Sequence, residues 1–289
     1  MQRILSTYRF VNQPLTPTLL QSVARAGVSS IEIFCASFHF DYRSMEAIRE
    51  ISASLRDHKL ELHSLHSPTE RNATPGRESG VPISISEPER VRRVDAVDEV
   101  KRALDVAETI PFRYLIQHIG SGRQQADPRN LDAAFNSLEH LVTFARHRGV
   151  TIAIENTPNE LGCPASLVQF IKETRLNELR FCFDTGHAHI EGGVAAGFDL
   201  MRDRVVTSHI HDNHGEKDEH LLPLEGTIDW AALLGAFASV PERVALVLEL
   251  KEAGAGAPTL ELIRGAFDKL EKGASEKGPR SSSSSAVHK

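Results

Sequence analysis

The sequence predicts a single closed barrel of eight parallel strands, each followed by a helix: a (β/α)8 or TIM barrel. Short β-type runs alternate with helical segments along most of the chain, which is the pattern of a parallel sheet with crossover helices. The length of 289 residues suits one barrel of this class, which typically has about 250 residues. The turn after the first run has no glycine-rich phosphate loop, which a doubly wound open sheet would carry there.

Eight β-type runs are expected to form the barrel. They occupy residues 4–7, 30–34, 60–66, 114–118, 151–155, 181–184, 205–211 and 244–249. Successive side chains of a strand point to opposite faces, so Glu155 shares its face with Ala153, and Asp184 shares its face with Cys182. We therefore expect small side chains inside the barrel and bulky ones against the helices.

Helices are expected between these runs, and two of them have clear starting signals. Thr16-Pro17 and Asp127-Pro128 each place a capping residue before a proline. The helices are expected at residues 17–26, 44–57, 89–109, 128–149, 165–174, 230–238 and 259–272. A further helix is poorly marked among Gly192, Gly193 and Gly197. Residues 1–272 form the expected barrel, and the serine-rich segment 273–289 is expected to be a disordered tail.

Composition limits the class of protein. The net charge of −6, from 33 basic and 39 acidic residues, gives no general basic field for nucleic acid. Cys35, Cys163 and Cys182 form no CxxC pair, which indicates free thiols in a reducing compartment. No apolar run approaches the roughly 20 residues that span a bilayer, and the N-terminus has no signal-peptide pattern. We expect a cytoplasmic protein with no membrane partner.

Nearly every expected strand carries a potential metal ligand at or near its carboxyl end. These residues are Glu32, His66, His118, Glu155, Asp184, His209, His211 and Glu249. The strand ends of such a barrel meet at one rim, where its active sites lie. Carboxylates gathered there repel one another unless a divalent cation binds them. The sequence therefore predicts a metal-dependent site at the rim.

Four segments of the chain resemble the xylose isomerase-like TIM barrels. They are IENTP at 154–158, FDTGHAH at 183–189, SHIHDNHGEKDEHLLPLEGTIDW at 208–230 and LVLELK at 246–251. This superfamily includes sugar and sugar-phosphate isomerases and epimerases. It also includes endonuclease IV, a zinc enzyme that cuts DNA at abasic sites. The resemblance covers essentially the whole chain before the tail.

Resemblance to the isomerase and epimerase branch implies one divalent metal ion, Mn2+ or Zn2+, with Mg2+ and Co2+ as alternatives. The implied ligands are Glu155, Asp184, His209 and Glu249. Glu155 and Glu249 would also be catalytic, transferring protons on opposite faces of a metal-bound enediolate. The residues expected to bind the carbohydrate substrate are His66, His118, His187 and His220. For His118, metal ligation and a hydrogen bond to substrate are equal alternatives.

Resemblance to endonuclease IV implies three zinc ions instead. The implied groups are His66, His118 and Glu155; Glu155, Asp184, His209 and Glu249; and His187, Asp218 and His220. A nuclease also needs cations and aromatic side chains to bind DNA. The loop at 67–82 offers only Arg71 and Arg77, whereas the loop after the second run offers Phe38, Phe40, Tyr42 and Arg43.

We favour a small-molecule isomerase or epimerase, with an endonuclease IV-like phosphodiesterase as the alternative and a non-catalytic binding protein as a third class. Self-association into a homo-oligomer stays open. Two alternatives involve no metal. Glu155, Asp184, His209 and Glu249 would then be four unrelated buried polar groups. Asp218 and His220 would belong to a polar loop that caps the segment near Glu225 and Gly226.

The sequence also leads to expectations about the roles of three further residues. Strand alternation places His63 on the face opposite to His66, so we expect it to be structural. Glu32 is left outside the metal set, either as a satisfied buried acid or as a substrate-binding residue. Leu224 stands where relatives often have glycine, which is expected to reshape the loop over the substrate.

Overall fold

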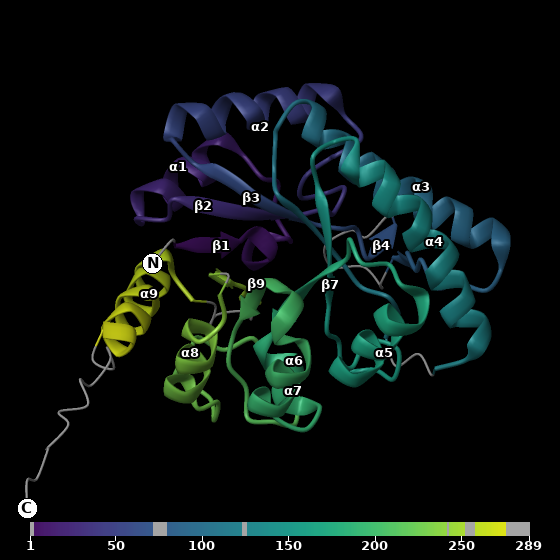
Figure 1. The fold of residues 1–289 in the computed structure, drawn as a ribbon. Helices are drawn as coiled ribbons and strands as arrows, with labels where there is room; N and C mark the ends of the chain where they lie inside the picture. Colours follow the sequence, from purple (N-terminus) through teal and green to yellow (C-terminus); the bar gives the residue numbers. More distant parts are fainter. Residues whose placement is uncertain (1–2, 72–79, 123–125, 242, 252–257, 276–289) are drawn as a thin grey trace, which may run out of the picture.

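Eight parallel strands close into a barrel in the computed structural model, which describes residues 3–71, 80–122, 126–241, 243–251 and 258–275 (Figure 1). Around the barrel the order is β1-β10-β9-β8-β7-β6-β3-β2, so each barrel strand pairs with the barrel strands that precede and follow it in sequence. The strands are β1 (Ile4–Ser6), β2 (Ser30–Phe34), β3 (Glu61–His66), β6 (Tyr114–Gln117), β7 (Thr151–Glu155), β8 (Arg180–Asp184), β9 (Val205–Ile210) and β10 (Ala245–Leu248). The predicted (β/α)8 barrel is confirmed.

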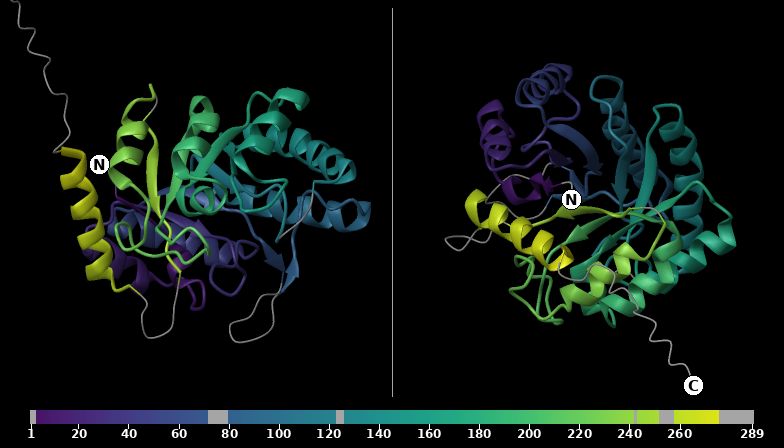
Figure 2. Two further views of the ribbon diagram at one scale, coloured as in Figure 1. Left: turned by 90° about the horizontal axis from the view of Figure 1, so that it is seen from below. Right: turned by 60° about the vertical axis from the view of Figure 1, so that its left-hand side comes forward.

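Helices surround the barrel (Figure 2). They are α1 (Pro17–Arg25), α2 (Met45–His58), α3 (Arg90–Asp105), α4 (Pro128–Arg146), α5 (Pro164–Thr174), α6 (Thr185–Ile190), α7 (Val194–Met201), α8 (Trp230–Ala238) and α9 (Leu260–Ser275). The predicted caps are present, because the Thr16 side chain accepts a hydrogen bond from the Leu19 N–H and the Asp127 side chain accepts one from the Arg129 N–H. No helix in the described ranges has both the length and the apolar character needed to cross a membrane.

Several local elements differ from the predictions. The segment after β3 contains a two-stranded hairpin of β4 (Glu70–Arg71) and β5 (Val81–Pro82), strands too short to give a periodic signal. One-turn 310 helices η1 (Thr7–Phe10), η2 (Val106–Glu108) and η3 (Arg202–Arg204) were not anticipated. The poorly marked helix is α7, which begins after Gly193.

The last helix ends later than predicted. It extends through Ser275, three residues past the expected end at Lys272, because a glycine inside a helix costs only about 1 kcal/mol and does not force an end. Residues 276–289, where most of the predicted tail falls, lie outside the described residues.

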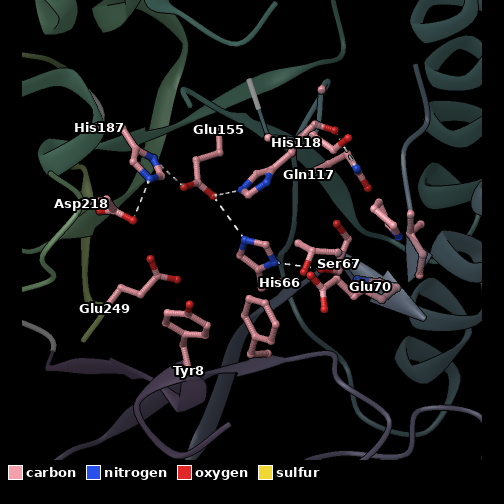
Figure 3. Close-up of a pocket in the computed structure, with 18 of the residues that line it drawn as sticks. Tyr8, His66, Ser67, Glu70, Gln117, His118, Glu155, His187, Asp218 and Glu249 are labelled. Atoms are coloured by element: carbon pink, nitrogen blue, oxygen red, sulfur yellow. Dashed lines mark hydrogen bonds and ion pairs between the residues drawn. The ribbon is translucent and has the colours of Figure 1, made fainter. Parts of the chain in front are cut away.

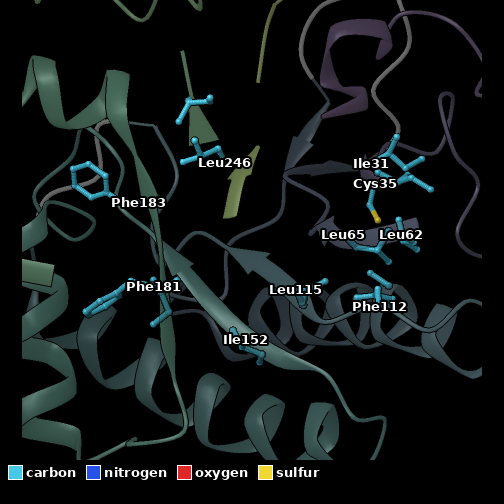
Figure 4. Packing of buried hydrophobic residues seen from close by; sticks show 14 of the residues in the cluster. Ile31, Cys35, Leu62, Leu65, Phe112, Leu115, Ile152, Phe181, Phe183 and Leu246 are labelled. Atoms are coloured by element: carbon cyan, nitrogen blue, oxygen red, sulfur yellow. The ribbon is translucent and has the colours of Figure 1, made fainter. Parts of the chain in front are cut away.

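Buried side chains form two separate layers, as the alternation along the strands predicted. Bulky residues such as Ile152, Phe181 and Phe183 pack between the strands and the helices (Figure 4). Ala153 and Cys182 belong to a separate small cluster inside the barrel, together with Ile116 and Val206. The small inner side chains leave the upper barrel free for the polar residues that follow them on the same face.

The alternation fails at one place, in β3. The pairing of β2 with β3 shifts register between Ile31 and Glu32, so that Ile31 faces Leu62 and Glu32 faces Ser64. His63 is the extra residue of this bulge. Its Nε2 lies 3.2 Å from the Thr207 Oγ1 of the facing wall, so His63 and His66 both point inward. The prediction of opposite faces was wrong because a bulge resets the alternation.

A buried carboxylate on α3 holds the loop that follows β2. Glu99 accepts hydrogen bonds from Tyr42 Oη at 2.9 Å and from Arg43 Nη2 at 2.6 Å, and it also pairs with Arg102. Burial favours a higher pKa for Glu99, but the bonds from Arg43 and Tyr42 and the charges nearby outweigh it and lower the pKa below its ordinary value.

We expect Glu99→Gln to lower the free energy of unfolding by about 1–3 kcal/mol at neutral pH. A carboxyl with a lowered folded-state pKa stabilises the fold above its ordinary pKa and loses this contribution as the pH falls through the folded-state value. Urea denaturation at neutral pH and at roughly pH 3 should therefore show a smaller difference at the acidic pH. Asp98→Asn, an equal charge change at an exposed neighbour, is the control. An equal difference at both pH values would contradict the assignment.

Candidate functional site

A cavity of about 440 Å3 lies at the carboxyl ends of the barrel strands (Figure 3). Glu155 and Asp184 end β7 and β8, His209 lies near the end of β9, and Glu249 follows β10. Each of the four residues offers a ligand atom within 4.8 Å of the others, and all four are buried. Residues that are up to 94 positions apart in the chain, 155 to 249, are thus brought to one point.

Two further groups of potential ligands adjoin this one. His66 and His118 meet Glu155, with their Nε2 atoms 3.4 Å and 3.1 Å from its Oε2. His187 and His220 meet Asp218, with their Nε2 atoms 3.7 Å and 2.9 Å from its Oδ2. Every residue that the sequence analysis named as a ligand or substrate contact therefore lies at this site.

Asp184 also begins the short helix α6. Its Oδ1 accepts a hydrogen bond of 2.7 Å from the His187 N–H, so one carboxylate caps the helix and places His187 one turn beyond it. Gly186 in the same turn packs on the ring of His211, where an added Cβ would lie 2.0 Å from Cε1. Only glycine fits there, which explains the residue types in the DTGH segment.

The donor set fits a divalent cation. His209 Nδ1 is buried without a hydrogen-bond partner among the described residues, yet it lies 3.2 Å from Glu155 Oε2 and 3.6 Å from Glu249 Oε2. The ring nitrogen therefore points at carboxylate oxygens, and a cation bound between them would satisfy all three groups. Imidazole with carboxylate is a ligand combination that suits Zn2+ and Mn2+.

The protonation of the site follows from this crowding. Burial favours a higher pKa for Glu155, but His209, His118 and His187 outweigh it and hold the pKa of this carboxyl well below its ordinary value. Burial favours a lower pKa for His209, yet its neighbours, Cys182 and Glu249 first among them, raise the pKa well above its ordinary value. Glu155 stays ionised as a consequence, which is the form of a carboxyl that binds metal, whereas a bound cation would displace a proton from His209.

Glu32 lies beneath the cluster as a satisfied buried acid, one of the two alternatives left open by the sequence. It accepts hydrogen bonds from Ser6 Oγ at 3.1 Å and Ser64 Oγ at 2.7 Å. His209 Nε2 lies 3.0 Å from its Oε1. Because Glu32 accepts a hydrogen bond from Nε2–H, the Nδ1 lone pair of His209 would face the cluster once a cation displaces its proton, as carboxylates behind metal-binding histidines arrange. The bulge at His63 is what brings Ser64 to this face.

We expect Glu32→Gln to weaken binding of Zn2+ or Mn2+ by about 10- to 100-fold, because the amide holds the His209 ring less firmly and no longer demands its Nε2 proton. Calorimetric titration of the metal-free protein measures this affinity. Glu70→Gln, at a cavity-lining acid bonded to the Gly80 N–H instead, serves as the control. Unchanged affinity in the Glu32 variant would show that Glu32 only contributes to folding.

Aromatic residues form a wall that sequence reasoning missed. Tyr8 lies on η1, and its ring centroid is 4.8 Å from that of Phe34. Its hydroxyl points into the cavity (Figure 3). Burial, followed by the charge of Glu249, raises the pKa of Tyr8 far above its ordinary value, so the hydroxyl remains a hydrogen-bond donor. The only available signal was that Tyr8 follows the first strand directly.

Asp212 is the second missed residue, and it organises the long loop after β9. Its carboxylate accepts hydrogen bonds from Trp230 Nε1 at 2.7 Å, the Leu224 N–H at 3.1 Å and the Ile228 N–H at 3.2 Å. This loop carries Asp218 and His220 to the cavity. An aspartate and a tryptophan 18 residues apart give no recognisable sequence motif.

Leu224 occupies a backbone conformation that favours glycine. Its φ is 76°, in the left-handed region that costs a bulky L-residue roughly 1–2 kcal/mol. The bonds to Asp212 hold this turn, and leucine adopts the left-handed conformation within it. That leucine reshapes the loop over the substrate stays a prediction.

We expect Leu224→Gly to raise the free energy of unfolding by about 1 kcal/mol, since glycine adopts this φ freely and the leucine side chain is half exposed. Thermal or urea denaturation checks the value. Leu224→Ala removes the side chain but keeps the Cβ, so it should bring no comparable gain. A destabilised glycine variant would mean that the leucine side chain contributes contacts that outweigh its strain.

The loop after β2 does not present the aromatic surface that a nuclease would use. Phe40 and Tyr42 are buried, and Arg43 pairs with Glu99. Among the three aromatic candidates named from the sequence, Phe38 alone is exposed, at 42%, and Arg43 is also exposed. Tyr42 and Arg43 therefore attach this loop to α3.

Comparison with known proteins identifies a family and a similar solved structure. A family model described as a xylose isomerase-like TIM barrel matches residues 20–272. The crystal structure of a D-tagatose 3-epimerase-like protein superposes with a TM-score of 0.78 at 21% identity, covering 96% of this chain and 99% of that one.

Two curated proteins align with the chain in sequence. The uncharacterized protein MJ1311 of Methanocaldococcus jannaschii is 26% identical over 285 residues, 94% of this chain and 92% of its own length. A probable endonuclease 4 of Natronomonas pharaonis is 26% identical over 170 residues, 52% of this chain and 60% of its own length. One of these two curated proteins thus has a name from the endonuclease branch, and the other is uncharacterized.

Proposed function

Because the chain belongs to the xylose isomerase-like TIM barrel family, we propose that it is a divalent-metal-dependent isomerase or epimerase of a sugar. The observation that carries the proposal is the meeting of Glu155, Asp184, His209 and Glu249 beside a cavity of about 440 Å3, which Glu155 and Glu249 line. This volume lies in the range of small-molecule sites. The structural similarity to a D-tagatose 3-epimerase-like protein supports a barrel of this class.

The four residues would hold the ion, Mn2+ or Zn2+ by ligand type, with Mg2+ or Co2+ as alternatives. A bound ion would polarise a carbonyl and an adjacent hydroxyl of the sugar, which makes the C–H between them more acidic. The remaining chemistry is proton transfer, and it falls to the side chains around the cavity.

The two catalytic candidates differ in how closely imidazole nitrogens approach their carboxylate oxygens. Glu155 Oε2 has the imidazoles of His66, His118 and His209 within 3.4 Å, so this oxygen is heavily shared. Glu249 Oε2 has its nearest imidazole nitrogens at 3.6 Å and 3.8 Å. We therefore assign the first proton abstraction to Glu249. Glu155 would return a proton to the other face after taking one from the His187 imidazolium, whose Nδ1 lies 3.4 Å from Glu155 Oε1.

The histidines of the two flanking groups would orient the substrate. His66, His118, His187 and His220 all line the cavity with ring nitrogens beside carboxylates. A sugar hydroxyl there can accept from an imidazole N–H and donate to a carboxylate. Tyr8 and Phe34 offer an apolar face for the C–H groups of a sugar ring.

A second candidate function is hydrolysis of a phosphodiester, as the relative named probable endonuclease 4 suggests. The supporting observation is that all three ligand groups expected for three zinc ions are assembled. The buried aromatic side chains of the loop after β2 count against binding of duplex DNA, so we rank this function second.

For the leading proposal we expect deuterium from D2O to enter ketohexoses at the carbon beside the carbonyl, in the presence of Mn2+ or Zn2+. Proton NMR measures the exchange, and chelation should abolish it. Glu249→Gln should lower kcat by about 10²- to 10⁴-fold, the size of a general-base contribution. Glu225→Gln, at an exposed acid of the β9–α8 loop, is the matched control.

Two results would reverse the ranking. The first is an absence of exchange with every ketose in a broad panel. The second is cleavage of an abasic-site duplex that is lost in Asp218→Ala, together with three tightly held zinc ions in the purified protein.

A further inference from the structure

A second cavity adjoins the first. It has a volume of about 890 Å3 and lies between the β7–α5 loop, the end of α6 and the β9–α8 loop. His118, His187 and Asp218 line both cavities, as do two glycines of the β6–α4 loop. The shared residues mark a boundary beside the ligand groups, so a molecule bound at the cluster can extend across it.

The walls of the second cavity suit a hydroxylated, uncharged group. Glu160, Glu191 and Glu216 supply carboxylates that accept hydrogen bonds from hydroxyl groups. Pro158 and Ile190 add apolar surface, which packs against the C–H face of a sugar ring. A sugar unit has hydroxyl groups beside apolar C–H faces. A wall that combines acceptors with apolar surface is complementary to it.

The charges of the residues that line the second cavity favour a neutral occupant over a phosphorylated one. Among the described residues that line the second cavity, Lys217 is the one lysine or arginine, against the carboxylates of Glu160, Glu191, Glu216 and Asp218. A phosphate would meet like charges there, and like-charge juxtaposition disfavours binding.

We propose that the second cavity is a binding site for a second, neutral sugar unit, so that the substrate is a ketose linked to another sugar. This inference rests on the proposed isomerase or epimerase function and names its substrate class. The reacting ketose occupies the first cavity, and the glycosidic link passes His187 and Asp218 into the second.

The test compares free and linked ketoses in the same exchange assay. D-Fructose is the free probe. Isomaltulose and lactulose carry the same fructose unit with a second sugar on O6 or O4. We expect kcat/KM for at least one disaccharide to exceed that for fructose by about tenfold or more, since each tenfold preference requires about 1.4 kcal/mol of added binding. Fructose 6-phosphate should show no such preference.

A variant that fills the second cavity tests whether the preference for a disaccharide over fructose arises there. Cys163 lines the second cavity and is not among the residues that line the first. Cys163→Phe should lower the ratio of disaccharide to fructose kcat/KM back toward one. Cys163→Ala removes the thiol without filling the space and should keep the ratio of the unaltered protein. Ile190→Trp supplies an independent filling variant if the first does not fold, as judged by thermal denaturation.

The outcomes separate the two proposals. Exchange with fructose at an equal or higher kcat/KM than with either disaccharide would overturn the second site and leave the isomerase or epimerase function standing. A preference that survives both filling variants would also overturn it. Exchange with no ketose, free or linked, would overturn the proposed function and this inference with it.

Discussion

The contact of one buried carboxylate with several imidazoles determines the rest of this site. Glu155 lies at the end of β7 with His66, His118, His187 and His209 around its two oxygens, at 3.1–3.4 Å. An ionised carboxylate in the barrel mouth is costly without compensation. Imidazoles from four other chain segments supply that compensation, and Glu155 thereby joins the ligand groups of His66 and of His209. The requirement that these segments meet explains why the strand ends carry the residues they do.

The layer beneath the cluster shows how the barrel holds these side chains in place. Glu32, Ser6 and Ser64 come from three neighbouring strands and form a polar floor under His209. The floor depends on the bulge in β3, which moves Ser64 onto the inner face. Below it, small residues such as Ala153 and Cys182 fill the narrow lumen. The chemistry of the rim is thus supported by hydrogen bonds one layer down.

The two long loops at the rim serve different purposes. The loop after β2 turns Phe40 and Tyr42 inward and attaches to Glu99 on α3 through Tyr42 and Arg43. The loop after β9 is pinned by Asp212, so that Asp218 and His220 reach the cavity although their backbone lies outside any strand. A loop held by internal hydrogen bonds can present ligands as firmly as a strand end does. This anchoring makes Leu224 tolerable in spite of its strained backbone.

The sequence by itself determined the barrel, the helix starts at Thr16 and Asp127, and the set of residues that gather at the rim. The barrel, the helix starts and the strand-end residues depend on local periodicity, capping and the rule that parallel strand ends meet on one side, whereas His187, Asp218 and His220 were implied by the family resemblance. The tertiary structure alone decided the bulge at His63, the role of Glu32, the wall formed by Tyr8 and the anchoring by Asp212. Each of these depends on contacts between segments that the sequence does not place beside each other. The second cavity belongs to the same class, because the space between three loops has no counterpart in the order of residues.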